Sequence, residues 1–159
     1  MRHILWISLL LFTLNSYALD YMHRPGIGFT NQMKTNHPTL SFKVQKSRRF
    51  AMGILAGIDT DDSSGGYGFG VKAYRILIDE PQLNFYGGFL GGLINQKNLG
   101  RESETGFQID LTLGTEFHFK GLNSLAFSLE FGFSFNKIND FVIETVGEHF
   151  VTAGVHFYL

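Results

Sequence analysis

The feature that most constrains this chain is a strict alternation of apolar and polar residues in its C-terminal half. Between residues 125 and 136 every odd position is Leu or Phe, and the even positions are Ala, Ser, Glu, Gly, Ser and Asn. A period of two is typical of a β-strand with one apolar and one polar face. The last run alternates in the same way, from Val151 to Leu159. The pattern predicts an all-β fold.

The same pattern predicts eight strands, at 25–33, 38–46, 50–59, 67–78, 83–95, 105–119, 125–136 and 148–159. Pro81, Gly121 and Asn123 suit the turns between them. The second, fourth and sixth connections are short, as is the first, at 34–37, whereas the third, fifth and seventh are longer. An even strand number places both termini at one end, and short turns at that end are typical of outer-membrane barrels. We therefore predict an eight-stranded antiparallel up-and-down transmembrane β-barrel.

The seventh connection leaves an alternative open. Residues 141–146 are apolar and β-prone, so the last strand can instead begin near Phe141, with a bulge at Gly147 and Glu148 restoring the face pattern. The resulting hairpin would protrude from the barrel and present an edge able to accept a strand from another protein. The simpler alternative is a strand extension that packs over the barrel mouth.

The N-terminal segment has the form of a secretory signal peptide. Arg2 and His3 precede an apolar stretch over 4–14, and Ser16 and Ala18 provide small residues before a cleavage site. We expect cleavage after Ala18, which gives a signal peptide at 1–18 and one domain at 19–159. The alternative is an uncleaved N-terminal anchor. Export together with the predicted barrel indicates a location in the bacterial outer membrane.

Composition excludes several classes of protein. Loss of Arg2 with the leader changes the net charge from −1 to −2, which predicts no nucleic-acid partner and no polybasic membrane patch. The chain has no cysteine, so a disulfide framework is excluded. A mean hydropathy of +0.03 is too polar for a helical membrane protein but ordinary for a barrel with a polar interior.

The polar face of the strands is mostly Gly, Ala, Ser, Thr, Gln and Asn, which suits a narrow barrel interior better than a water-exposed surface. The Phe and Leu face would then contact lipid. This orientation predicts a polar network inside the barrel, formed by Lys43, Lys72, Asp110, Glu116 and Glu130. Because isolated buried charges are costly, we expect Lys72 to pair with Asp110 or Glu130. A packed polar plug is favoured over an ion gate, and a soluble periplasmic lipocalin-like barrel is the inverted alternative.

No catalytic or metal site is predicted. Ser128, His156, Glu116 and His118 face inward, but the expected register places Ser128 between Glu116 and His156, whereas a catalytic triad needs a central His. The histidines at 23, 37, 118, 149 and 156 have no paired ligand spacing. The acidic connection after Asp59 lacks the EF-hand pattern, so we predict no metal and no cofactor.

The leader, the strand architecture and the final run together resemble the small eight-stranded outer-membrane barrels of the OmpX type and the OmpA transmembrane domain. The resemblance identifies Val151, Val155, Phe157 and Leu159 as a C-terminal assembly signal, although this chain ends in Leu where the family usually has Phe. It implies a structural or adhesin-like surface role without a wide pore. The implied partners are outer-membrane lipid, the barrel-assembly machinery and an extracellular partner at the outer loops. Lipid-modifying enzymes share this architecture, but residues 130–134 hold Ser134 without their His-x-Ser pair.

Overall fold

The computed structural model describes residues 22–35, 37–61, 65–97, 103–138, 140–147 and 150–159, so the predicted signal peptide at 1–18 lies outside the described residues. The described residues form nine strands: β1 (Pro25–Thr30), β2 (Thr39–Ser47), β3 (Phe50–Asp59), β4 (Gly66–Glu80), β5 (Leu83–Gln96), β6 (Glu104–Phe119), β7 (Leu122–Lys137), β8 (Phe141–Thr145) and β9 (Thr152–Tyr158). They contain no helix, and hence no helix that is long and apolar enough to cross a membrane.

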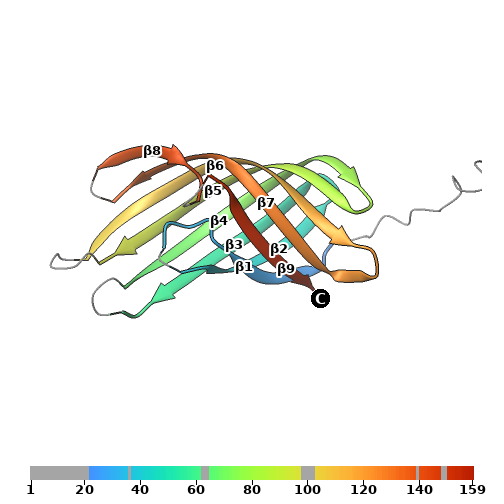
Figure 1. Ribbon diagram of the computed structural model, residues 1–159, viewed down its shortest axis with the longest axis horizontal. Coiled ribbons are helices and arrows are strands. Elements are labelled where there is room, and N and C mark those ends of the chain that lie inside the picture. The colour runs from blue at the N-terminus through green and yellow to red at the C-terminus, as the bar shows by residue number, and fades with distance from the viewer. Residues whose placement is uncertain (1–21, 36, 62–64, 98–102, 139, 148–149) are drawn as a thin grey trace, which may run out of the picture.

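The strands form a closed antiparallel barrel (Figure 1). Sequential neighbours pair from β1 to β7, and β9 pairs with both β1 and β7, so eight strands complete the ring. β8 pairs with the remaining length of β7 beyond β9. The predicted fold class is confirmed.

The two ends of the barrel differ. Both Pro25 and Tyr158 lie at one end, which we call the terminal end, together with three two-residue turns at Arg48–Arg49, Pro81–Gln82 and Lys120–Gly121. Gly121 has a φ of +89°, which glycine adopts without steric cost. The opposite end, the loop end, carries the longer connections and the β7–β8 hairpin (Figure 1).

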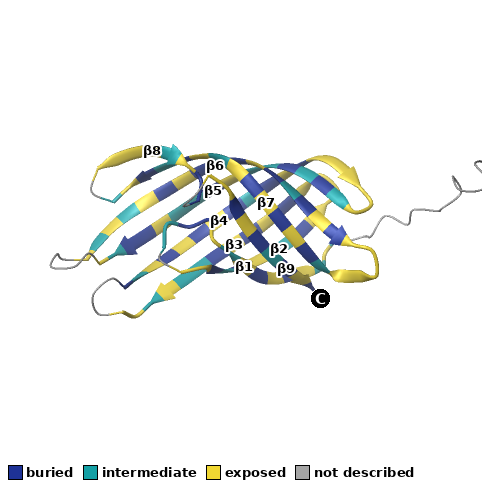
Figure 2. Ribbon diagram, viewed as in Figure 1, coloured by how far each residue is buried: buried dark blue, intermediate teal, exposed yellow. Residues whose placement is uncertain are grey.

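Buried residues alternate with more exposed ones along most of the barrel strands, as the colours of β7 in Figure 2 show. On β7, Phe127, Leu129 and Phe131 are exposed on the outside, whereas Ser128 and Glu130 are buried inside. The apolar face is therefore the outer one. The inverted arrangement, a lipocalin-like barrel with a Phe- and Leu-lined cavity, is wrong for this chain.

The first predicted strand is too long. Sheet pairing ends at Thr30 instead of residue 33, and the chain then folds into the barrel, where Gln32 and Met33 are almost fully buried. Met33 packs on the apolar cluster of Leu55 and Leu90, and Gln32 hydrogen-bonds to buried charged groups. These interior contacts replace the ladder bonds that a longer strand would make.

The last predicted strand, 148–159, is observed as β9 from Thr152 to Tyr158, and the separate strand β8 precedes it. The alternative in which it begins near Phe141 is the one observed: β8 pairs with β7 from Phe141 opposite Lys137 to Thr145 opposite Phe133. Thr145 pairs with Phe133 of β7 and Thr152 pairs with Glu130, so only two residues of β7 lie between these partners. The six residues 146–151 are therefore four more than β7 can pair in this interval. An even excess keeps the face pattern of β8 in phase with that of β9. The predicted bulge at Gly147 and Glu148 falls in this segment between β8 and β9. Gly147 has a φ of +79°, whereas Glu148 lies outside the described residues.

Inward-facing glycines separate side chains that bond to each other. Gly28 lies between Ser41 and His156, and Gly114 lies between Tyr86 and Glu130. Because glycine has no side chain, its two neighbours can meet across it inside the barrel. A Cβ atom at residue 114 would lie 2.6 Å from Glu130 Cγ and 2.9 Å from the Leu129 carbonyl oxygen.

We predict that Gly114→Ala destabilises the barrel by about 1–3 kcal/mol, because the added methyl group overpacks the interior. Urea unfolding of the protein in lipid vesicles measures the change. Gly91→Ala is the matched control, since a Cβ atom there meets only Phe89 Cε1, at 4.0 Å. Equal stabilities of the two variants would contradict close packing around Gly114.

Candidate functional site

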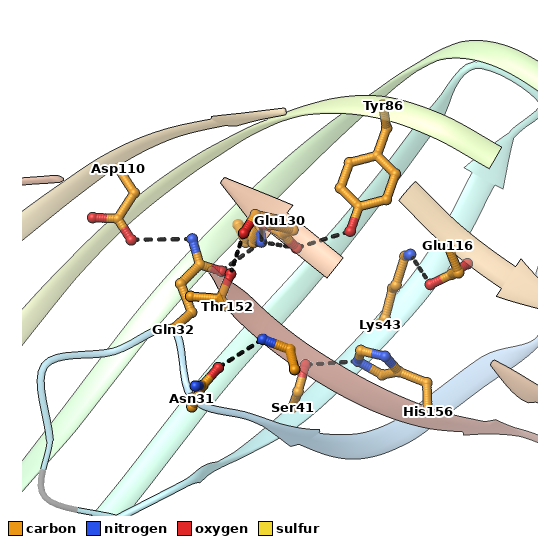
Figure 3. Close-up of polar contacts among 12 residues, drawn as sticks. Asn31, Gln32, Ser41, Lys43, Tyr86, Asp110, Glu116, Glu130, Thr152 and His156 are labelled. Atoms are coloured by element: carbon orange, nitrogen blue, oxygen red, sulfur yellow. Dashed lines mark hydrogen bonds and ion pairs between the residues drawn. The ribbon is translucent and has the colours of Figure 1, made fainter. Parts of the chain in front are cut away.

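The centre of the barrel interior holds a buried ion pair that crosses from β4 to β7. Lys72 Nζ lies 2.6 Å from Glu130 Oε1, and both residues are almost fully buried. Tyr86 donates its hydroxyl to the same carboxylate oxygen at 2.8 Å (Figure 3). Of the two partners predicted for Lys72, the structure brings Glu130 to it. Buried charges require such pairing and additional hydrogen bonds.

A second ion pair lies nearer the terminal end and crosses from β2 to β6. Lys43 Nζ is 2.6 Å from Glu116 Oε2. Tyr158 donates its hydroxyl to the other oxygen of Glu116 at 3.1 Å, and His118 Nε2 lies 3.4 Å from that oxygen. Since Tyr158 belongs to β9, this pair also links the closing strand to β6, which lies on the far side of β7.

The last predicted charge, Asp110, lies on the loop-end side of these pairs. Its carboxylate accepts hydrogen bonds from Gln32 Nε2 at 3.0 Å and from Gln108 Nε2 at 2.9 Å. Gln32 in turn accepts from Lys72 through its side-chain oxygen, so it connects Asp110 to the central pair. Sequence reasoning missed Gln32 because it extended the first strand to residue 33. No signal in the sequence shows that the chain turns inward at Asn31.

Aromatic rings separate the two lysines. Lys43 Nζ lies 4.5 Å from the centre of the Tyr74 ring, and Lys72 Nζ lies 4.7 Å from the same ring. Tyr86 packs edge-on against Tyr74, with 5.3 Å between ring centres. Cation–π attraction from one ring to two cations favours both buried charges and offsets part of their mutual repulsion.

Together the five predicted residues form a connected series of contacts along the interior. Two lysines face three carboxylates, and the third carboxylate, that of Asp110, is held by amide donors and the more distant Lys72. The network ties β2, β4, β6 and β7 together across the interior. Beside it, Met33, Leu55, Leu90 and Ile94 pack as an apolar cluster, in which Leu90 is the cross-strand partner of both Lys72 and Asp110. The arrangement suits a rigid plug better than a wide conduit.

The candidate catalytic residues do not form a triad. His156 Nε2 lies 2.9 Å from Ser41 Oγ, across Gly28 (Figure 3). The sequence had suggested Ser128 as the serine beside His156. His156 Nδ1 has no hydrogen-bond partner among the described residues, so no carboxylate orients the ring. A Ser–His contact without an orienting acid lacks the third member of a nucleophile–base–orienter set.

Within the described residues, no group of three His, Cys, Asp or Glu side chains could hold a metal ion. Asp59 instead pairs with His37, at 3.2 Å. The acidic connection considered for calcium includes Asp62, Ser63 and Ser64, which lie outside the described residues.

The residues of the predicted assembly signal lie on the outer surface of the closing strand. Phe157 is 54% exposed and Leu159 is 71% exposed, while Val151 and Val155 share the same face. Arg24 donates to the carbonyl oxygens of Tyr158 and Leu159, both at 2.9 Å, and so ties the first residues of the barrel to the last.

No family model and no curated protein matches the sequence. Among solved structures, the chain is similar to the N-terminal β-barrel domain of OprF from Pseudomonas aeruginosa, with a TM-score of 0.60 and 14% identity over 87% of this chain and 98% of that one. Ail, the attachment invasion locus protein of Yersinia pestis, matches with a TM-score of 0.43 and 10% identity over 86% of this chain and 94% of Ail. The likeness to the OprF domain agrees with the closed barrel: the chain has the fold of the small eight-stranded barrels that its sequence resembles.

We predict that Glu130→Gln destabilises the barrel by about 3 kcal/mol or more, because it leaves Lys72 buried without its counter-ion. The double variant Lys72→Met, Glu130→Met should recover most of that loss, since no charge then remains unpaired. Urea unfolding in vesicles gives the three free energies. The half-buried pair Lys34 and Glu144, whose side chains are 20% and 38% exposed, is the control, and its removal should cost less, about 1 kcal/mol. A double variant no more stable than Glu130→Gln would show that the pair is not coupled.

Proposed function

We propose that this chain is an integral outer-membrane β-barrel with a structural and surface-interaction role and no catalytic turnover. The observation that carries the proposal is the outer face, where exposed Leu, Ile, Val and Phe side chains occur on strands all around the barrel. An apolar surface of this extent is unfavourable in water and suits lipid. The buried polar interior supports the same arrangement, because membrane barrels place their polar face inside and their apolar face against lipid.

In this proposal the terminal end faces the periplasm and the loop end faces outward. Two-residue turns on one side and longer loops on the other match the usual layout of such barrels. The signal peptide at 1–18 would direct export. Val151, Val155, Phe157 and Leu159 would present the closing strand to the barrel-assembly machinery.

The surface role is assigned to the β7–β8 hairpin. Within the described residues β8 pairs with β7 alone, so its second edge has no strand partner. Phe141 and Ile143 on β8 are 58% and 59% exposed. An unpaired edge with apolar side chains can add a strand from an extracellular protein. Glu144 fixes the base of the hairpin. Its carboxylate accepts a hydrogen bond from Asn136 Nδ2 at 2.6 Å and forms an ion pair with Lys34 Nζ at 3.1 Å.

Cell fractionation with gel analysis tests the membrane assignment. We expect recovery in the outer membrane and a mobility on SDS gels that changes between unboiled and boiled samples. Recovery in the osmotic-shock fluid without such a change would contradict the proposal.

A charged substitution on the outer face measures whether that face contacts lipid. Leu129 lies midway along β7 and is 47% exposed, so Leu129→Arg should destabilise the barrel in vesicles by about 2–4 kcal/mol. Ile58→Arg, near the loop-end limit of β3, should cost at most about 1 kcal/mol. Equal and small effects at both positions would indicate a water-exposed face.

The hairpin assignment predicts that Phe141→Lys with Ile143→Lys lowers attachment of producing cells to an epithelial monolayer, because lysine on an edge strand opposes strand addition. Ile58→Lys is the control, since Ile58 is 79% exposed at the same end. Both variants should keep the heat-dependent mobility. Attachment that is unchanged in the double variant would remove the surface role from the hairpin and leave the barrel assignment intact.

A further inference from the structure

The outer wall carries a groove that the functions above do not use. Its volume is about 710 Å³, and it is lined by outward side chains of five successive strands, from Phe50 on β3 to Phe131 and Phe133 on β7. Strand register explains its shape. One row of cross-strand partners runs Phe50, Arg75, Gly87, Leu113, Phe131, and the next runs Ala73, Phe89, Leu111, Phe133. The small residues Ala73 and Gly87 leave the space, and the large residues around them form its sides.

The groove rises from the terminal end toward the middle of the wall. At β3 the row begins with Phe50, the first residue after a terminal-end turn, and at β7 it reaches Phe131, nine residues beyond the start of the strand. Four strand spacings of about 4.8 Å give it a length of about 19 Å. That length is comparable to the depth of one leaflet, which is half of the roughly 30 Å hydrocarbon core.

Three arginines, Arg48, Arg49 and Arg75, lie where the groove meets the terminal end. A second hollow, of about 480 Å³, is lined by Arg48, Arg49 and Arg75 together with Ile76, Leu77 and Asp79, so Arg75 belongs to both spaces. The Ile76 amide donates to the Arg49 carbonyl oxygen at 3.0 Å, which holds the β2–β3 turn against β4. Among the described residues, none of the three guanidinium groups has a carboxylate within ion-pair distance.

We propose that the outer groove and the three arginines form a binding site for one anionic phospholipid of the inner leaflet, with its phosphate at Arg48, Arg49 and Arg75 and an acyl chain in the groove. The inference rests on the proposed function, which places the terminal end at the periplasmic face. Charge complementarity selects the ligand: three cations and one carboxylate, Asp79, favour a headgroup with net negative charge over a zwitterionic one. Guanidinium groups also bind phosphate oxygens in bidentate geometry. The net charge of the whole chain, −1, does not indicate this basic site, because carboxylates elsewhere in the chain balance the arginines.

Native mass spectrometry of the mature barrel tests the inference. The protein is folded into vesicles of equal parts phosphatidylglycerol and phosphatidylethanolamine with identical acyl chains, extracted, and weighed with its bound lipid. We expect phosphatidylglycerol adducts to exceed phosphatidylethanolamine adducts, and the preference to fall by about fivefold for each arginine changed to Gln. Equal adducts of both lipids in the unmodified protein would overturn the site.

A groove-filling variant tests the acyl-chain part independently of charge. Gly87→Leu places a side chain in the groove, and a Cβ atom at residue 87 meets nothing closer than 3.9 Å, so the wall is not strained. Phosphatidylglycerol retention should fall severalfold in Gly87→Leu and stay unchanged in Gly91→Leu, which lies on the same face of β5 outside the groove. Equal retention in the two variants would overturn the groove as the chain site.

The same samples distinguish failure of the lipid site from failure of the proposed function, because each is also run unboiled and boiled on SDS gels. A chain that never inserts into vesicles or shifts in mobility overturns the proposed function, and this inference with it. An inserted, heat-shifting barrel with no lipid preference overturns this inference alone.

Discussion

Closure of the sheet is the constraint on which the rest of this structure depends. Each backbone N–H and C=O group in a lipid environment needs an internal partner, and an open sheet edge has none. Pairing of β9 with β1 and β7 supplies those partners for the strands of the ring, and it fixes their number at eight. A ring of eight leaves an interior wide enough for side chains only, so the interior must be filled by the chain itself.

The filling follows from that narrow space. Large polar side chains fit where a glycine faces them, as Tyr86 and Glu130 do across Gly114. Charges that enter the interior must pair there, and the Lys72–Glu130 and Lys43–Glu116 bonds join walls that the ladder alone leaves apart. The outer face carries the opposite chemistry. Arg75, the charged residue in the lining of the groove, lies at the level where lipid headgroups would meet the barrel.

Alternation of residue type was sufficient to predict the architecture. The inward face was predicted from the small residues of the polar face, and the five charged residues on that face are buried in the structure. Alternation could not predict Gln32, because a strand and an inward-folded loop begin with the same residues and only the contacts with Asp110 and Lys72 distinguish them. The contact between Ser41 and His156 was missed for a related reason, since it depends on the β1–β2 and β1–β9 registers across Gly28. Register also decides which outward residues form the groove, and periodicity within one strand contains no information about it.

If the barrel lies in a membrane, odd-numbered residues of β7 contact lipid and even-numbered residues face a filled interior. The chain has no cysteine, so a nitroxide can be attached to single cysteines placed one at a time from residue 125 to 136 in the vesicle-inserted barrel. Electron paramagnetic resonance then gives the collision rate of each label with oxygen, which concentrates in the bilayer, and with a water-soluble nickel complex. We predict high oxygen accessibility at every odd position and low accessibility to both reagents at every even one. The opposite phase, or high nickel accessibility along the odd face, would contradict a membrane barrel.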